Sequence, residues 1–374
     1  MKILVAPNAM KGSLSAFDFA DIVEKAFLQY PHDFQVRKIP VADGGDCTGE
    51  VLARSFNARQ VVVEVTGPFG HPVQSQYSIA GNKAIIEMAD ASGMKLVSAH
   101  ELNPMQASSY GTGQLIADAI ARGCDEIELA IGGSATVDGG MGMMEALGFR
   151  FFDKNGKELH GNGENLGKIK AIQAVELPKR PTINIICDVD NPLLGSNGAA
   201  AVFGPQKGAD PDMVQQLEQG LHNWNALISA KTGKDMSQVN GAGAAGGMAV
   251  PLVAFMAANM VPGATFVLEQ LGVEESVQWA DLVITGEGKI DSQTLNNKAP
   301  FAVAQVARKH NKTVVAIGGK VDGEASDAFD GIYSLVNGPM KLDEAMSNSA
   351  ILLHRWASQL AKTLMSLKNT IKKS

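Results

Sequence analysis

Cysteine and aromatic side chains are scarce in this sequence. Its three cysteines, Cys47, Cys124 and Cys187, lie far apart, which excludes a Cys-x-x-Cys metal pattern and a disulfide framework. Aromatic residues make up 6% of the 374 residues, too few to suggest a surface that stacks nucleic-acid bases. We therefore expect a protein of a reducing compartment, located in the cytoplasm.

Excess positive charge, long apolar runs and metal-type histidine spacings are also lacking. The chain has 32 lysines and arginines against 39 acidic residues, a formal net charge of −7, so we expect no nucleic-acid partner. No window reaches the roughly 18 apolar residues of a membrane helix. The N-terminal apolar run ends at Ala6, which is too short for a signal peptide. The seven histidines form no His-x-x-x-His pattern, which argues against zinc chemistry.

Glycine is abundant, with 40 residues, and the strand and helix patterns alternate at both ends of the chain. Strand-like runs at 2–6, 34–39, 281–285 and 313–317 are interspersed with helical patterns at 15–29, 48–55 and 299–310. Strand, loop and helix in succession favour a parallel, doubly wound sheet. A further amphipathic helix is predicted over 343–367.

The middle of the chain has a mixed pattern. Strands at 61–65, 76–80 and 83–88, with Gly81-Asn82 between the last two, predict a hairpin, and a second hairpin is expected at 149–160. Strand-loop-helix units are expected at 126–147 and 183–198. Because the length exceeds what one core usually organises, we predict an α/β protein with two domains. One is a discontinuous parallel-sheet domain of residues 1–60 plus 285–374, and the other is an inserted mixed α/β domain of residues 61–284.

Five glycine-rich loops could carry the chemistry, mostly at the carboxyl ends of predicted strands, where open parallel sheets bind their ligands. Glycine lets backbone N–H groups approach an anion closely, although plain turn geometry is the alternative reading of any one loop. The loops are Ala42-Asp43-Gly44-Gly45-Asp46, Ser108-Ser109-Tyr110-Gly111-Thr112-Gly113, Ile131-Gly132-Gly133-Ser134-Ala135-Thr136-Val137-Asp138-Gly139-Gly140, Gly241-Ala242-Gly243-Ala244-Ala245-Gly246-Gly247 and Thr285-Gly286-Glu287-Gly288-Lys289-Ile290-Asp291.

Two known nucleotide-binding motifs, the P-loop and the dinucleotide fingerprint, can be looked for directly in the sequence. No Gly-x-x-x-x-Gly-Lys-Ser/Thr occurs, which excludes an ordinary P-loop. Gly241-x-Gly243-x-x-Gly246 matches the dinucleotide fingerprint, but the segment before it, 235–240, lacks the strand pattern that a Rossmann unit requires. Close packing on small residues explains this loop as well or better.

Acidic and lysine side chains recur in or beside these loops. Carboxylates there can bind magnesium or accept a hydroxyl proton, and loop lysines can neutralise phosphate charge. Helix capping, Asx turns and solvated surface lysines are the competing readings. The acidic candidates are Asp43, Asp188, Asp190, Glu287 and Asp291, and the lysine candidates are Lys11, Lys207 and Lys289.

Taken together, the loops resemble the glycerate kinase family, in its bacterial type I glycerate 2-kinase form. The resemblance covers nearly the whole chain, in order and spacing. It is carried by Pro7 to Leu14, Pro40 to Gly45, Ser109 to Gln114, Ile131 to Thr136 with Asp138-Gly139-Gly140, Cys187-Asp188-Val189 with Asn191-Pro192-Leu193, Val202 to Ala209, Gly241 to Gly247, and Ile284 to Gly288 with Asp291 and Gln293-Thr294.

The resemblance implies magnesium-dependent phosphoryl transfer from ATP to D-glycerate, with 2-phosphoglycerate the expected product. It also implies a flavodoxin-like or Rossmann-like domain built from both chain ends, with a distinct α/β domain inserted. The cofactors expected are ATP and Mg²⁺, and the expected partners are small molecules, with no nucleic acid, no membrane and a homo-oligomer left open. Lys289 stands where the family often has arginine, so the charge is kept without the bidentate fork.

On this resemblance we expect Asp188 to orient the substrate hydroxyl or take its proton, with Asp43 the second choice, and Lys11 or Lys289 to hold the carboxylate. The full expected site is: catalytic Asp188, Asp43 and Lys289; substrate-binding Lys11, Ser13, Gly44, Gly45 and Ser109; phosphate-binding Gly132, Gly133, Ser134, Thr136, Gly286 and Gly288; metal-binding Asp190, Glu287 and Asp291.

Other functions remain open at this stage. A nucleotide-cofactor dehydrogenase of a small hydroxy acid would rest on the Gly241 fingerprint, and a sugar-acid-binding module would bind ligand without ATP turnover. Within the kinase hypothesis, a related hydroxy acid or a 3-phosphoglycerate product is the alternative.

Overall fold

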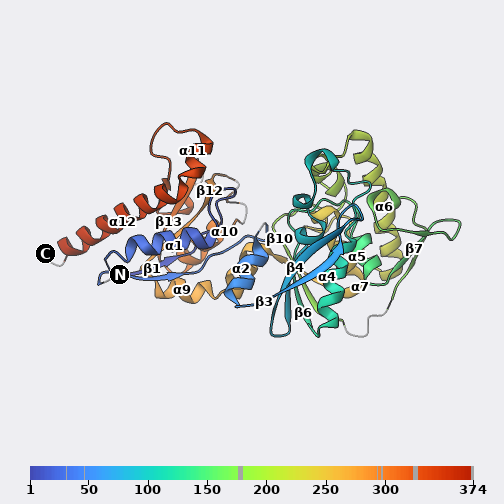
Figure 1. Cartoon of the computed structure of the whole chain (residues 1–374), viewed down its shortest axis with the longest axis horizontal. Coiled ribbons are helices and arrows are strands. Elements are labelled where there is room, and N and C mark those ends of the chain that lie inside the picture. The colour runs from blue at the N-terminus through green and yellow to red at the C-terminus, as the bar shows by residue number, and fades with distance from the viewer. Residues whose placement is uncertain are drawn as a thin grey trace. The chain divides into compact units, whose positions relative to one another are not determined.

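The structure, a computed structural model, describes residues 1–30, 32–45, 47–175, 180–292, 294–295, 298–322 and 327–371. The chain forms two compact units (Figure 1). We call residues 1–43 with 264–374 the terminal unit and residues 44–263 the central unit. Asp46, Gln293 and the end of the chain from residue 372 lie outside the described residues.

The terminal unit is built on a five-stranded parallel sheet. Its strands are β1 (Lys2–Val5), β2 (Gln35–Lys38), β12 (Leu282–Ile290), β13 (Thr313–Val321) and β14 (Gly331–Ser334), in the order β14-β13-β12-β1-β2. The register joins Ile3 to Leu282 on one side of β1 and to Val36 on the other. Strands from both ends of the chain therefore pair directly.

Helices cover both faces of this sheet because the buried side chains of β1 alternate. Ile3 and Val5 pack in one cluster with α1 (Ala16–Phe27) and α12 (Ser349–Ile371), whereas Leu4 packs in another with α8 (Gly263–Gln270), α9 (Val273–Trp279) and α10 (Ala299–Lys309). Figure 1 shows α1 and α12 alongside each other in this unit. Helix α1 begins where Ser15 caps it by accepting from the Asp18 N–H at 3.0 Å.

The central unit has a six-stranded mixed sheet in the order β11-β10-β6-β5-β4-β3. The antiparallel strands β3 (Arg59–Thr66) and β4 (Pro72–Ala80) form one edge, and β4 turns at Gly81, whose φ of +63° suits the two-residue turn, into β5 (Lys83–Glu87). From β5 onward the strands run parallel: β6 (Glu126–Ala130), β10 (Thr182–Cys187) and β11 (Asn259–Pro262).

The remaining elements complete the two units. In the central unit the helices are α2 (Thr48–Ser55), α3 (Ala89–Ser92), α4 (Tyr110–Ala121), α5 (Met141–Ala146), α6 (Pro211–Thr232) and α7 (Ala249–Met256), and β7 (Arg150–Phe152), β8 (Glu158–Leu159) and β9 (Ala171–Gln173) form a small antiparallel sheet. Short helical turns occupy Met94–Leu96, Ala99–Glu101, Gly163–Asn165, Ala199–Phe203, Pro205–Lys207 and Ala244–Gly246, and α11 (Leu342–Ser347) precedes α12 in the terminal unit.

The predicted fold class is confirmed: a parallel sheet from both chain ends accompanies a mixed sheet from the middle of the chain. The compact units differ from the predicted domain ranges in two segments. Residues 44–60 belong to the central unit, since α2 packs on β4 and β5, and residues 264–284 belong to the terminal unit, since α8 and α9 pack in its core.

Three local expectations differ from the structure. Strands β12 and β13 continue to Ile290 and Val321, past the predicted strand ends at residues 285 and 317. The helix predicted over 343–367 is divided between α11 and α12, because Ser347, Asn348 and Ser349 each donate a side-chain hydrogen bond to a backbone carbonyl of the preceding turn. No α-helix directly follows β10, where 183–198 was expected to end in one.

Candidate active site

A cavity of about 740 Å³ in the terminal unit is lined by the loops after β1, β2 and β14 and by the last residues of β12 and β13. Strand β1 lies between β2 and β12, which makes it the point where the order of the strands reverses and where open sheets place their ligands. The loop after β1 is fixed to β12, because the Asn8 N–H donates to the Gly286 carbonyl at 2.8 Å. Six of the predicted residues line this cavity: Lys11, Ser13, Asp43, Glu287, Gly288 and Lys289.

Of the predicted carboxylates, Asp43 and Glu287 line this cavity, and Asp291 contacts the lining residue Lys289. Asp43, only 8% exposed, lies 3.3 Å from the Lys298 ammonium, and Asp291 forms an ion pair with Lys289. Glu287 Oε1 accepts from the Thr294 hydroxyl at 2.7 Å. Burial raises the pKa of Glu287 to about 7; the Thr294 hydrogen bond opposes this rise, and the negative charges of Asp43 and Asp291 add to it.

The chemistry of this donor set fits a magnesium ion carried by a nucleotide. A cation beside Glu287 would restore the charged form that burial disfavours, and carboxylate oxygens are the hard ligands magnesium prefers. Over the part of the chain that the structure describes, no three His, Cys, Asp or Glu side chains form a ready-made metal cluster. Mg²⁺ usually takes one or two protein carboxylates and completes its shell with water and phosphate oxygens.

Apolar side chains form a further part of the lining of the same cavity, which we call the apolar wall. Leu335, Val336, Met340, Leu342 and Met346 line it, with Leu352 from α12. Ser13 is tied to this wall because its hydroxyl donates to the Met346 carbonyl at 3.2 Å. The lining of the cavity therefore combines charged and apolar side chains. Sequence reasoning did not identify this wall. Leu335, Val336, Met340 and Leu342 lie before the helix predicted over 343–367, and Met346 and Leu352 read only as part of its apolar face.

A smaller cavity of about 110 Å³ lies in the central unit, at the carboxyl ends of β6 and β10. Among the predicted residues, Gly44, Gly132, Gly133, Ser134 and Asp188 line it. Because β6 and β10 are parallel neighbours, the loop that begins at Ile131 and the acidic residue after Cys187 come together at one edge of the sheet.

Lys207 lines the small cavity and is only 2% exposed. Its ammonium donates to the Ser134 hydroxyl at 2.6 Å and to the Thr136 carbonyl at 2.7 Å. Burial lowers the pKa of Lys207 to about 7, although the negative charge of Asp138 acts to raise it. The glycine loop 204–208 made this lysine a candidate in the sequence, but its burial had no sequence signal, and it was not placed in the expected site.

Asp138 holds the 131–140 loop in shape. Its carboxylate accepts from the Ser109 N–H and hydroxyl at 2.8 and 2.6 Å and from the N–H groups of Gly140 and Gly142 at 3.1 and 3.2 Å. Burial raises the pKa of Asp138 while these hydrogen bonds act to lower it. Ser109 and Thr136 are fully buried, and neither lines the small cavity.

The remaining predicted residues lie apart from the two cavity walls. Asp190 is exposed and belongs to the central unit, whereas Glu287 and Asp291 belong to the terminal unit. The Gly45 carbonyl accepts from the Thr48 hydroxyl at 2.8 Å. Gly286 lies within β12, where an added Cβ would be 2.4 Å from the Ile317 carbonyl oxygen, so close strand packing accounts for this glycine.

The Gly241 to Gly247 loop shows backbone packing and no preceding strand. An added Cβ would lie 2.2 Å from the Pro192 carbonyl oxygen at Gly243 and 2.2 Å from the Thr136 carbonyl oxygen at Gly246. Residues 235–240 form no strand. The loop thus supports the floor of the small cavity, which Ala244 and Ala245 line, and it lacks the βαβ context of a dinucleotide site.

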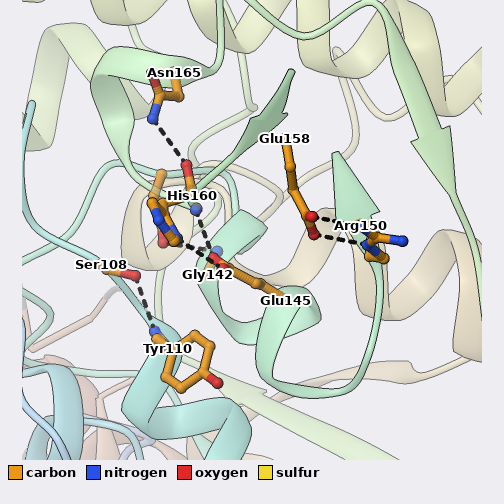
Figure 2. Close-up of polar contacts among 10 residues, drawn as sticks. Ser108, Tyr110, Gly142, Glu145, Arg150, Glu158, His160 and Asn165 are labelled. Carbon is orange, nitrogen blue, oxygen red and sulfur yellow. Dashed lines mark hydrogen bonds and ion pairs between the residues drawn. The ribbon is translucent and has the colours of Figure 1, made fainter. Parts of the chain in front are cut away.

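A second polar cluster in the central unit was not expected from the sequence. Figure 2 shows Glu145 bonded to His160, whose Nδ1 lies 3.0 Å from Oε1, while the Ser108 hydroxyl accepts from the Tyr110 N–H at 3.2 Å. The Gly161 N–H donates to the other Glu145 oxygen at 2.7 Å. These contacts tie the end of β8 to α5.

Both units therefore bring glycine loops, carboxylates and lysines to the carboxyl ends of parallel strands. This arrangement defines the class as an α/β enzyme that binds small anionic molecules. In the described residues no helix has the length and apolar character needed to cross a bilayer.

Comparisons with known proteins narrow this class. The model of the glycerate kinase family matches residues 3–365. The chain is 40% identical to the glycerate kinase of Halalkalibacterium halodurans, over 96% of this chain and 97% of that protein, and 40% identical to the glycerate 2-kinase of Escherichia coli, over 97% and 98%. A crystal structure of a Salmonella typhimurium protein assigned as glycerate kinase 2 superposes with a TM-score of 0.89 at 40% identity, covering 99% of each chain.

The chain belongs to the glycerate kinase family. That membership makes it an ATP-dependent phosphotransferase with glycerate kinase activity, as the resemblance in the sequence predicted.

Proposed function

We propose that the protein transfers the γ-phosphoryl group of ATP to the 2-hydroxyl of D-glycerate and yields 2-phosphoglycerate. The observation that carries the proposal is the pair of cavities at the carboxyl ends of parallel strands, in a chain 40% identical to a protein named glycerate 2-kinase. The same relative supports the choice of the 2-hydroxyl over the 3-hydroxyl.

The sizes of the cavities support a division of the two substrates. The large cavity, about 740 Å³, lies within the ordinary range for nucleotide-sized ligands, whereas the small one, about 110 Å³, equals the liquid volume of roughly four waters. We assign ATP to the large cavity, with the base against the apolar wall, and glycerate to the small one.

This division changes several expected roles. Lys11, Ser13, Lys289 and Gly288 become contacts to the nucleotide phosphates, because they line the large cavity. Gly132, Gly133 and Ser134, with Gly44, become contacts to glycerate. Ser109 and Thr136 then affect glycerate binding indirectly, through the 131–140 loop.

Magnesium would be held by Glu287, assisted by Asp43 and Asp291, and when bound it would neutralise charge on the phosphates. Asp190 remains a weaker candidate, since it is exposed and in the other unit. Lys298, paired with Asp43, adds positive charge to the same cavity. Together these side chains and the bound magnesium would hold the triphosphate of ATP and balance its negative charge.

Asp188 remains the first choice for orienting the substrate hydroxyl. It lines the small cavity and is partly exposed, so its carboxylate can accept the hydroxyl hydrogen bond and take the proton as the oxygen bonds to the γ-phosphorus and ADP leaves. Positioning and charge balance provide most of the rate enhancement in such transfers.

The direct experiment replaces this carboxylate. We expect Asp188→Asn to reduce kcat by roughly 100-fold or more, the usual range for loss of a general base, in an assay that couples ADP release to NADH oxidation. The exposed Asp212→Asn on α6 is the matched control and should leave kcat unchanged. Turnover of Asp188→Asn near that of the unaltered protein would remove Asp188 from the reaction, and phosphorus NMR of the product would identify the phosphoglycerate isomer.

Location and assembly complete the proposal. Cys124 and Cys187 are buried as thiols and form no disulfide in the structure, which supports a cytoplasmic location. A homo-oligomer remains a prediction, and analytical ultracentrifugation of the purified protein measures it.

A further inference from the structure

Lys207 is the most deeply buried lysine that borders a cavity in the described structure. It ends a short helical turn, Pro205–Lys207, and the chain leaves at Gly208 with a φ of +93°. An added Cβ on Gly208 would be 2.2 Å from the Leu102 carbonyl oxygen, so the loop is held closely against its neighbour. The backbone thus directs a long cationic side chain inward from a fixed position.

The hydrogen-bond partners of Lys207 do not balance its charge. Both acceptors, the Ser134 hydroxyl and the Thr136 carbonyl, are neutral. Asp138 is the charge that favours its protonated form, but the Asp138 carboxylate already accepts hydrogen bonds from Ser109, Gly140 and Gly142. An ammonium has three N–H donors, and two of them are used. A donor and a positive charge therefore remain for a ligand.

We propose that Lys207 binds the carboxylate of the three-carbon acid inside the small cavity. This inference rests on the proposed function, which assigns glycerate to that cavity. The Gly132-Gly133-Ser134 loop and Asp188 form the rest of the wall, so one end of the ligand meets a cation and another meets a carboxylate that accepts its hydroxyl. Lys207 is then the residue that selects an acid over a neutral polyol.

Burial explains why Lys207 can strongly favour an acid over a neutral polyol. An ammonium removed from water loses its hydration, which lowers the pKa of Lys207 to about 7, and an anionic ligand returns the missing interaction. A neutral analogue would leave the same group uncompensated. The expected preference for a carboxylate is therefore larger than a surface lysine would give.

The test compares Lys207→Met, Lys207→Gln and Lys207→Arg by steady-state kinetics. We expect Lys207→Met to raise the KM for D-glycerate by roughly 100-fold, as for truncation of one partner of a buried charge pair, while the KM for ATP changes by less than about threefold. Lys207→Arg should recover part of the affinity. Lys207→Gln keeps a donor for Ser134 and Thr136 without the charge, and it replaces Lys207→Met if that variant does not fold.

Glycerol provides a second measurement, because it has glycerate's hydroxyls without the carboxylate. The ratio of kcat/KM for D-glycerate to that for glycerol should collapse in both uncharged variants. An unchanged KM for glycerate in a folded variant would overturn the inference, as would a rise confined to the KM for ATP. If the unaltered protein phosphorylates no glycerate, the proposed function itself fails, which is a separate result.

Discussion

Two buried ionisable side chains stand out at the level of single residues. Glu287 and Lys207 each have a pKa of about 7, and in both cases burial is the main cause. Burial disfavours the charged form of either group, so the carboxyl pKa rises and the ammonium pKa falls. A cation would restore the charge of Glu287, and an anion would restore that of Lys207. These charge requirements agree with a magnesium-bound nucleotide at Glu287 and an organic acid at Lys207.

Glu287 gives a prediction on the pH dependence of stability. Its folded pKa of about 7 lies above the ordinary 4.5, so the folded state binds more protons between these values and stability falls as the pH rises through this window. Glu287→Gln removes this loss. In metal-free buffer, we expect the variant to gain stability relative to the unaltered protein between pH 5 and 8, by up to about 3 kcal/mol.

Urea unfolding at each pH measures this difference, and activity provides a second readout. The exposed Glu269→Gln serves as control and should show the same pH dependence as the unaltered protein. A difference that stays constant from pH 5 to 8 contradicts the prediction. Because Glu287 is a proposed magnesium contact, the stabilised variant should also lose activity.

At the level of elements, the small cavity depends on loops that pack backbone against backbone. Gly246 has a φ of +68°, and an added Cβ would be 2.2 Å from the Thr136 carbonyl, the same carbonyl that accepts from Lys207. A β-carbon there must displace either the 241–247 loop or the loop that contains Thr136. The glycines of the 241–247 loop thus maintain the shape of the small cavity, and their effect on substrate binding is indirect.

We expect Gly246→Ala to destabilise the protein by about 2–4 kcal/mol, through backbone strain and overlap together. Gly233→Ala is a matched control, since Gly233 also has a positive φ, +74°, but has no atom within 4 Å of an added Cβ. It should cost only about 1–2 kcal/mol, from the left-handed backbone alone. Thermal unfolding compares the two, and equal losses would show that overlap at Gly246 contributes nothing.

Element types were largely predictable from the sequence, whereas their ends were less so. Apolar runs and helical spacing gave β1, α1, α10 and the hairpin turn at Gly81, because these patterns are local. The glycines at 286 and 288 suggested a loop, yet β12 continues to Ile290 because its backbone pairs with β13 through Glu287↔Gly318 and Ile290↔Val321. Pairing with a partner strand is not visible in a local pattern.

For the site, the sequence located loops but not their environment. Asp43, Glu287 and Lys289 were predicted from residue type and position, and the structure brings them to one cavity. The burial of Lys207 and of Ser109 depends on chain segments distant in sequence, and a lysine between glycines reads equally as a surface residue. Residue type therefore indicated chemistry, while packing decides which side chains can meet a ligand.

At the level of the whole molecule, each unit has its own hydrophobic core. The largest buried cluster consists entirely of central-unit residues, from Val61 to Ala258, and the other two consist of terminal-unit residues. The two ends of the central unit adjoin, since an added Cβ on Gly44 would lie 2.8 Å from the Gly263 Cα. Adjacent ends and a separate core are the features of a domain that tolerates excision.

We therefore expect residues 44–263, expressed alone, to fold cooperatively. Residues 1–43 joined to 264–374 by a short glycine linker should fold as well, because the adjoining ends leave little distance to bridge. Circular dichroism during heating measures each fragment, with a sigmoidal transition as the expected result. Leu129→Asp, which places a charge at a fully buried position of β6, is the control that should abolish the transition of the central fragment. A fragment that melts gradually, or that resembles its Leu129→Asp control, would mean that the cores depend on each other for stability.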